Sequence, residues 1–369
     1  MKLIIDGVIF ENNAFGGIKR IFSNVLPLMC DLDPKLRVVL FFKKTPQSFL
    51  PIHPQISYVH FEKMPDYLHP WHLWQPHYEK IRNHYMKLRF GNDPTSIWLS
   101  TYFTRPFTKW HGKEVVFVYD LIYEMYPELL PGSERVIRKK NQAILSADKV
   151  FCISATTARD LQKFYPVTDS RIVVTHLSHD QIFSIRKSKN QSTATEKFIL
   201  YVGRRGFYKG FNLLLNAYSK WDKNREIKLF VVGPSWSPEE KSLLLSLGVE
   251  GAVSLFENID DEQLCDLYNQ AEAFIYPSEY EGFGIPLLEA MACGCPVIAS
   301  NIPSTQEVAG EVPIYFEPGN TNSLERALDL LSNNAEIQTR VSKGIAVAGG
   351  FSWKNTASQI YRALKALYE

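Results

Sequence analysis

Short runs of apolar, often β-branched residues recur along this chain, and segments with helical spacing separate them. The runs are continuously apolar rather than alternating, which indicates strands buried on both faces, as in parallel sheets covered by helices. They comprise residues 3–5, 38–42, 97–99, 115–119, 150–153, 172–174, 198–202, 228–232, 253–256, 273–276, 297–299 and 314–316. The repeated order of strand, helix and strand predicts an α/β protein built from doubly wound parallel sheets.

The chain has 369 residues, which exceeds the size at which one hydrophobic core stays efficient, so two domains are expected. Residues 187–195 contain no large apolar side chain and are typical of an exposed linker. The sequence therefore predicts a first Rossmann-like domain over residues 1–185, a linker over 186–196 and a second Rossmann-like domain over 197–350. Residues 351–369 complete the chain as a C-terminal helix.

The composition excludes several classes of partner. Lysine and arginine number 41 against 39 for aspartate and glutamate, so the net charge is +2 and no global field would recruit nucleic acid.

The five cysteines are an odd count, which fits reduced thiols in a cytoplasmic protein rather than a disulfide scaffold. No apolar run reaches the roughly 18 residues that a membrane-spanning helix needs. We expect a cytoplasmic protein, with peripheral contact at the inner face of a membrane left open.

The stretch with the clearest chemistry covers residues 273–300, where a strand passes through a glycine-containing loop into a helix. Gly282 and Gly284 let the backbone approach a ligand closely, and the helix N-terminus offers unpaired N–H groups to an anion. Glu281 precedes the helix and Glu289 lies within it, so two carboxylates could grip two hydroxyl-bearing parts of one ligand. The alternative is that Glu281 complements the helix dipole and Glu289 is a solvated surface residue. The glycines and the preceding strand favour the ligand site.

A basic loop follows the strand predicted at 198–202. Arg204, Arg205 and Lys209 share this loop with Gly203 and further glycines, at the strand end where open α/β sheets bind ligands. The cations could reach a diphosphate, since a charge-assisted hydrogen bond contributes roughly 1.5–3 kcal/mol against roughly 0.3–1 kcal/mol for a helix dipole. A solvated basic loop is the alternative, and the spacing matches neither the dinucleotide fingerprint nor the P-loop.

Two segments of the first half carry further candidates. Gly17 lies in a glycine pair before the first predicted helix, where backbone N–H groups could meet a phosphate. Residues 67–90 are dense in aromatic, histidine and basic side chains, and Trp71 and Trp74, whose rings could stack on a second, sugar-containing substrate, are candidates for its binding together with Arg20. The alternatives are an ordinary turn and a loop packed on its own core.

No metal site is expected from the cysteines or histidines. Cys293 and Cys295 lie one residue apart without the second cysteine pair of a zinc site, so small buried residues at a helix end are favoured. The histidines near residue 72 have no acidic or cysteine partners at ligand spacing.

Taken together, these motifs resemble glycosyltransferase family 4, retaining enzymes of the GT-B fold that use nucleoside-diphosphate sugars. The resemblance rests on Glu281 and Glu289 with seven residues between them, on Arg204 with Lys209 five residues later, and on a closing Phe-Ser-Trp. It covers nearly the whole chain and is strongest over 198–318. It implies two Rossmann-like domains facing across a cleft, the second holding the nucleotide-sugar.

The resemblance implies transfer of a hexose from a nucleoside-diphosphate sugar to a hydroxyl of a glycan or lipid-linked glycan in surface polysaccharide synthesis, as in bacterial mannosyl- and glucosyltransferases. No metal or other cofactor is implied. Carried over by motif position, Arg204 or Arg205 would neutralise the donor diphosphate together with Lys209. Glu289 would hold the nucleotide ribose and Glu281 the transferred sugar.

Further roles follow from the same resemblance. Backbone N–H groups of Phe283 and Gly284 would meet the sugar or phosphate, and Gly203 belongs to the donor loop. Gly17 would approach the diphosphate from the first domain. Asp120 matches a catalytic position of the family, and the C-terminal helix would return to the first domain.

The sequence departs from the family at one position. Tyr119 precedes Asp120 where many members have a histidine, so a mechanism that needs that imidazole does not transfer to this chain. Two other functions stay open as alternatives: a non-catalytic subunit that binds sugar nucleotides, and a phosphorylase, epimerase or hydrolase of the same fold.

Overall fold

The computed structural model describes residues 1–11, 16–42, 46–47, 49–60, 93–106, 110–186, 196–224 and 226–368. The chain divides into two compact units. The first comprises Met1–Leu177 and Trp353–Glu369, and the second Ser178–Ser352. The division falls at residue 177, before the predicted linker, and residues 187–195 of that linker lie outside the described part of the chain.

The first unit contains a parallel sheet in the order β3-β2-β1-β4-β5-β6-β7. Its strands are β1 (Lys2–Asp6), β2 (Arg37–Phe42), β3 (Ile56–His60), β4 (Ser96–Ser100), β5 (Lys113–Val118), β6 (Lys149–Cys152) and β7 (Ile172–Val174). Its helices are η1 (Val8–Glu11), α1 (Gly16–Leu32), α3 (Ile122–Met125), α4 (Ser133–Ser146), α5 (Ala155–Phe164), η4 (Asp169–Arg171) and α13 (Trp353–Tyr368). Strand β3 was not predicted, because it lies at the sheet edge and buries only Ile56 and Val59.

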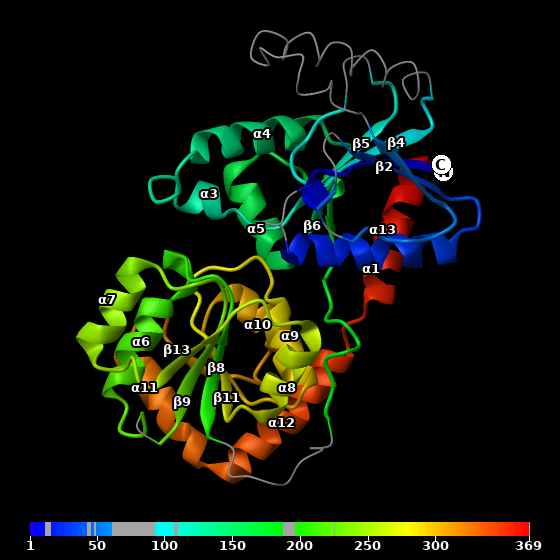
Figure 1. Cartoon of the computed structure of the whole chain (residues 1–369). Helices are drawn as coiled ribbons and strands as arrows, with labels where there is room; N and C mark the ends of the chain where they lie inside the picture. The colour runs from blue at the N-terminus through cyan, green and yellow to red at the C-terminus, as the bar shows by residue number, and fades with distance from the viewer. Residues whose placement is uncertain are drawn as a thin grey trace, which may run out of the picture. The chain divides into compact units, whose positions relative to one another are not determined.

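The C-terminal helix α13 belongs to the first unit, where it packs against α1 (Figure 1). Its stripe of buried residues includes Ile360 and Leu364, spaced as one face of a helix. The Tyr361 hydroxyl donates to Asp33 Oδ2 at 3.0 Å, in the turn after α1. The first unit is therefore completed by the last residues of the chain.

The second unit contains a parallel sheet in the order β10-β9-β8-β11-β12-β13. Its strands are β8 (Phe198–Val202), β9 (Lys228–Val232), β10 (Val253–Phe256), β11 (Ala273–Tyr276), β12 (Val297–Ser300) and β13 (Ile314–Phe316). Its helices are η5 (Phe207–Lys209), α6 (Phe211–Lys220), α7 (Pro238–Leu247), α8 (Asp261–Gln270), α9 (Ile285–Ala292), α10 (Pro303–Ala309), α11 (Thr321–Asp329), η6 (Leu330–Ser332) and α12 (Asn334–Gly349). Each strand begins at its predicted residue, and the α/β fold of two parallel sheets is confirmed.

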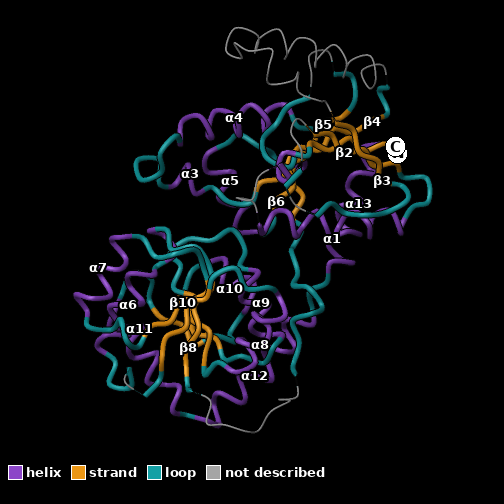
Figure 2. The backbone as a smooth tube through the Cα atoms, viewed as in Figure 1, coloured by secondary structure: helices purple, strands orange, loops and turns teal. Residues whose placement is uncertain are grey.

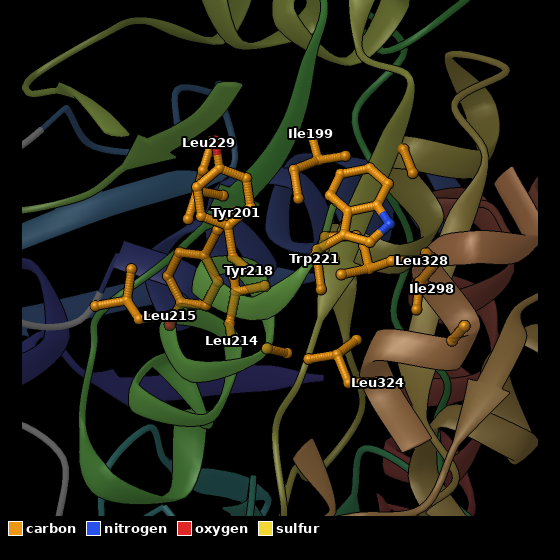
Figure 3. Close-up of a cluster of buried hydrophobic side chains, with 14 of the residues drawn as sticks. Ile199, Tyr201, Leu214, Leu215, Tyr218, Trp221, Leu229, Ile298, Leu324 and Leu328 are labelled. Carbon is orange, nitrogen blue, oxygen red and sulfur yellow. The ribbon is translucent and has the colours of Figure 1, made fainter. Parts of the chain in front are cut away.

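A core of large side chains joins α6 and α11 to this sheet (Figure 3). Trp221 is buried there and donates from Nε1 to Asp329 Oδ1 at 3.0 Å. Tyr218 is buried beside it, and its hydroxyl donates to the carbonyl of Ile227 at 2.8 Å. Each such side chain contributes roughly 1.5–3 kcal/mol on burial, and the hydrogen bonds satisfy its polar atom.

The order of strands in the second unit places a switch point between β8 and β11. From β8 the chain runs outward to β9 and β10 and then returns to β11 on the other side of β8, with helices flanking the strands (Figure 2). Ligands of open α/β sheets bind outside the carboxyl ends of the strands at such a point. The predicted basic loop follows β8 and the loop with Glu281 follows β11, so the topology brings the two loops together.

Candidate functional site

The loops after β8 and β11 touch through a glycine. Gly210 ends the first loop with φ +66°, and a Cβ at this position would lie 2.0 Å from the carbonyl oxygen of Pro277. A side chain is therefore excluded by both backbone conformation and space. Beside this contact, the Glu279 N–H donates to the Tyr208 carbonyl at 2.8 Å. These contacts fix the position of Lys209, which lies between Tyr208 and Gly210.

Lys209 and Glu281, two residues predicted separately, form an ion pair in the structure. Lys209 Nζ donates to Glu281 Oε1 at 2.6 Å, and Ser278 Oγ donates to the same oxygen at 2.7 Å. The side chains are 23% and 12% exposed, so the pair lies at the surface of the site without being fully solvated. Burial, together with the Glu281 carboxylate, raises the pKa of Tyr276 well above its ordinary value. Tyr276 therefore stays a neutral hydroxyl.

Glu289 is buried in α9, at 4% exposure. The prediction's alternative, a solvated surface residue, is therefore wrong. The hydroxyl of Tyr268 lies 3.4 Å from Glu289 Oε2 as a long hydrogen bond. Burial, with the Glu289 carboxylate second, raises the pKa of Tyr268 well above its ordinary value, so this hydroxyl remains a donor. A buried carboxylate in the first turns of α9 is costly unless it has polar partners.

Helix α9 begins at a glycine with left-handed backbone. Gly284 is the N-cap residue with φ +115°, and Pro286 occupies the first turn, where its missing N–H costs nothing. Phe283 is buried, and its ring contacts that of Phe351 edge-on at 6.0 Å between centroids. In the loop after β8, Gly203 has φ +138° and open space where a Cβ would be.

The two arginines of the basic loop lie in different surroundings. Arg205 is engaged within the unit: its Nε lies 2.7 Å from Glu240 Oε1 and its Nη2 3.0 Å from Glu240 Oε2. Its side chain is 3% exposed. Arg204 has an exposed side chain, and its carbonyl accepts a hydrogen bond from Tyr201 at 2.8 Å. The geometry therefore separates the two residues, which the sequence left as alternatives.

The candidates of the first unit are placed as follows. Gly17 lies in the first turn of α1, and a Cβ there would meet nothing within 4 Å. Arg20 is half-buried on the same helix. Trp71 and Trp74 lie outside the described residues.

Asp120 lies between β5, which ends at Val118, and α3, which begins at Ile122. Its Oδ1 accepts from the Ile122 N–H at 3.1 Å, and its carbonyl accepts from Lys140 Nζ at 3.0 Å. Lys140 is itself paired with Glu124 at 2.8 Å, and both side chains are buried. A buried ion pair thus fixes the backbone of Asp120.

Tyr119, which stands at the family's histidine position, is a core residue. It is buried, and its hydroxyl donates to the carbonyl of Thr101 at 2.7 Å. Burial, with the carboxylate of Asp6 second, raises the pKa of Tyr119 well above its ordinary value. The side chain therefore serves the packing of the first unit.

Sequence reasoning missed Ser278, Tyr276 and Glu240 as members of the site. Ser278 lies three residues before Glu281 in the loop that the sequence predicted to bind a ligand, so this spacing could have indicated that the two side chains interact. Glu240 has no such signal, because it reaches Arg205 from a different helix. Among the described residues, no three His, Cys, Asp or Glu side chains gather as a metal site would require. In the same residues no helix has both the length and the apolar character to cross a membrane.

Comparison with known proteins finds a family model that matches most of the second unit. Residues 183–346 match the family model described as Glycosyl transferases group 1. The O-antigen chain mannosyltransferase B of Escherichia coli is 28% identical over 269 residues, which cover 69% of this chain and 71% of that protein. The serotype-specific mannosyltransferase WbdA of Escherichia coli is 28% identical over 226 residues, or 57% of this chain, but this match spans only 28% of WbdA.

Solved structures match the whole chain in fold. Sucrose-phosphate synthase from Thermosynechococcus elongatus has a TM-score of 0.76 at 20% identity, covering 99% of both chains. HepE of Anabaena, solved in complex with UDP and glucose, has a TM-score of 0.74 at 15% identity, covering 99% of this chain and 100% of that chain. At these identities the likeness concerns the fold, which is GT-B.

Proposed function

We propose that this chain, a glycosyltransferase of the GT-B fold whose residues 183–346 belong to the group 1 glycosyl transferases, moves a hexose from a nucleoside-diphosphate sugar to a hydroxyl of a glycan or lipid-linked glycan, with retention of configuration. One observation carries the proposal: Lys209 and Glu281 meet at the switch point of the second sheet. A cation for phosphate and a carboxylate for sugar hydroxyls then lie 2.6 Å apart.

The roles we propose follow the geometry of the second unit. Arg204 and Lys209 neutralise the diphosphate, because Arg204 is exposed and Lys209 lies at the surface of the site. Glu281 holds hydroxyls of the transferred sugar. The Phe283 and Gly284 N–H groups, at the start of α9, meet the sugar or phosphate. Glu289, inside that helix, holds the ribose.

We propose a front-face transfer in which this chain's residues supply electrostatic stabilisation. The bond from the anomeric carbon to the β-phosphate oxygen breaks, and a bond from the acceptor oxygen forms on the same face. The acceptor proton passes to the leaving diphosphate. Lys209 and Ser278 both donate to Glu281 Oε1, which favours binding over nucleophilic attack for this carboxylate. Preorganised cations stabilise the departing charge.

For the acceptor and the sugar we propose the following. Asp120 of the first unit takes part in the transfer itself, with its backbone held by Lys140, and Arg20 contributes to acceptor binding. Mannose is the hexose we propose first, because the two bacterial relatives are named mannosyltransferases. Synthesis of a surface polysaccharide is proposed on the same ground.

Donor screening tests the proposal. Thermal unfolding is measured with GDP-, UDP- and dTDP-sugars, since a ligand at 100 times its Kd stabilises the folded state by about 2.7 kcal/mol. The stabilising donor is then incubated with the protein and a glycan acceptor, and proton NMR records the anomeric configuration of the glycosidic bond that forms. A retained configuration supports the proposal; inversion, or a donor left intact with no acceptor glycosylated, contradicts it.

A further inference from the structure

Arg205 joins three segments that meet at the carboxyl ends of β8 and β9. It belongs to the loop after β8, and its Nη2 donates to the carbonyls of Pro234 and Ser235, at 2.7 and 2.9 Å, in the loop after β9. It also forms the two-pronged ion pair with Glu240 in the first turn of α7. A bidentate ion pair of this kind fixes the geometry of its two partners in addition to pairing their charges.

We infer that Arg205 is a positioning residue, which locks the 203–210 loop and so sets Lys209 for the donor diphosphate. This inference rests on the proposed function, because it names a residue that supports the proposed diphosphate site. It also assigns different work to the neighbouring arginines: Arg204 meets the ligand, and Arg205 holds the loop.

Contacts on its own helix hold Glu240 in the ion pair with Arg205. Its Oε2 accepts from the Ser237 N–H at 2.8 Å, which closes the capping box of α7, while both oxygens accept from Arg205. Burial would raise the pKa of Glu240, but the hydrogen bonds from Arg205 and Ser237 outweigh it, and the pKa lies below its ordinary value. Arg205 could turn to a ligand only by leaving this carboxylate without its partner.

The surroundings of the guanidinium enclose it on its remaining sides. It stacks on Trp236 at 4.4 Å from the ring centroid and lies 5.6 Å from that of Phe211. Its Nη1 is buried, and among the described residues it has no hydrogen-bond partner. A Cβ at Gly233 would lie 2.8 Å from this nitrogen and 2.6 Å from the Gly203 carbonyl, so Nη1 faces strand-end backbone.

The loop that begins at Gly203 is short, so the contacts of Arg205 also restrict the position of Lys209. At its start the Gly203 N–H donates to the Val232 carbonyl at 2.9 Å, and at its end the Lys209 N–H donates to the Gly206 carbonyl at 2.9 Å. Arg205 fixes the middle. Releasing it would free the loop between β8 and η5, and the ammonium of Lys209 would sample more positions.

The test is a double-mutant cycle on the full chain. Arg205→Lys keeps the positive charge but loses the bidentate hydrogen bonds of the guanidinium. Glu240→Gln keeps the size of the side chain but loses its charge. A third variant combines the two substitutions. Glu239→Gln, on the same turn of α7, is the matched control, since its side chain is exposed. Calorimetry measures the Kd of the nucleoside diphosphate that binds the wild type, and hydrogen exchange measures protection of the Lys209 N–H without ligand.

We expect each single variant and the double variant to raise the Kd by the same factor, about tenfold, because each of them breaks the same ion pair between Arg205 and Glu240. Exchange at Lys209 should accelerate in all three and stay unchanged in Glu239→Gln. A Glu240→Gln variant that binds as tightly as the wild type with unchanged exchange, while Arg205→Lys binds weakly, would make Arg205 a direct ligand and overturn the inference.

Two further outcomes are separated by the same measurements. If the wild type binds no nucleoside diphosphate, the proposed function fails, whereas hydrogen exchange still decides whether Arg205 and Glu240 order the loop. If Glu240→Gln does not fold, Glu240→Asp takes its place. This variant keeps the charge but shortens the reach, and unchanged exchange at Lys209 in Glu240→Asp together with Arg205→Lys counts against the inference.

Discussion

The ammonium of Lys209 lies 2.6 Å from Oε1 of Glu281, across 72 residues of sequence. Gly210 has no side chain, which lets the two loops that carry these residues touch at Pro277. The pair leaves the cation balanced while no ligand is bound. An incoming diphosphate brings a second source of negative charge to the same ammonium, so the pair is suited to exchange one partner for another.

Lys209→Ala should remove transition-state stabilisation and leave the fold intact. We expect turnover to fall about 100-fold or more, the loss typical of a preorganised donor. The free energy of unfolding should change by about 1 kcal/mol or less, since the ion pair is partly solvent-exposed. Lys220→Ala, at the exposed end of α6, is the matched control. Equal turnover in the two variants would remove Lys209 from the mechanism.

Glu281→Gln should separate the sugar from the nucleotide. The variant loses the carboxylate that we assign to sugar hydroxyls, and it releases Lys209 from its partner. We therefore expect turnover to fall about 100-fold while the Kd of the nucleoside diphosphate stays the same or decreases. Glu279→Gln is the control, because the loop contact uses the backbone N–H of Glu279, which the substitution keeps. A matching loss of nucleoside diphosphate affinity would assign Glu281 to the nucleotide instead.

Gly210→Ala should lower the free energy of unfolding by more than the left-handed backbone conformation alone would cause. Gly248 has the same φ of +66°, but a Cβ there would meet nothing within 4 Å. Alanine at Gly248 should therefore lower the free energy of unfolding by about 1 kcal/mol. Alanine at Gly210 should add about 1–3 kcal/mol for the overlap with Pro277 and should also lower turnover. Chemical denaturation measures both, and equal costs would mean that the loops do not touch.

Tyr119→Phe should affect stability and not catalysis. The variant leaves the Thr101 carbonyl without the Tyr119 hydroxyl inside the first unit, at a cost of about 1 kcal/mol in the free energy of unfolding. Turnover should remain that of the wild type. Tyr368→Phe, an exposed tyrosine near the chain's end, is the control for stability. A large loss of turnover in Tyr119→Phe would show that this hydroxyl has replaced the family's histidine in the reaction.

Much of the fold and part of the site could be predicted from the sequence. Parallel strands buried on both faces are continuous apolar runs, so all six strands of the second unit were found, whereas β3, an edge strand with two buried residues, was not. Glu281 and Lys209 were found because each lies in a contiguous motif beside a strand end.

What the sequence left open depends on contacts between distant segments. The pairing of Lys209 with Glu281 requires β8 and β11 to be neighbours, which strand order decides. The separate fates of Arg204 and Arg205 depend on Glu240, which reaches the loop from α7. The burial of Glu289 follows from α9 being covered on most of its surface, which periodicity alone does not reveal for so short a helix.

The most direct measurement of the central claim is a crystal structure of the chain with its stabilising nucleotide-sugar bound. We predict diphosphate oxygens within about 3 Å of Lys209 Nζ, and sugar hydroxyls at the same distance from the Glu281 carboxylate. A donor bound elsewhere, with the ion pair between Lys209 and Glu281 intact and neither side chain in contact with the ligand, would contradict the account.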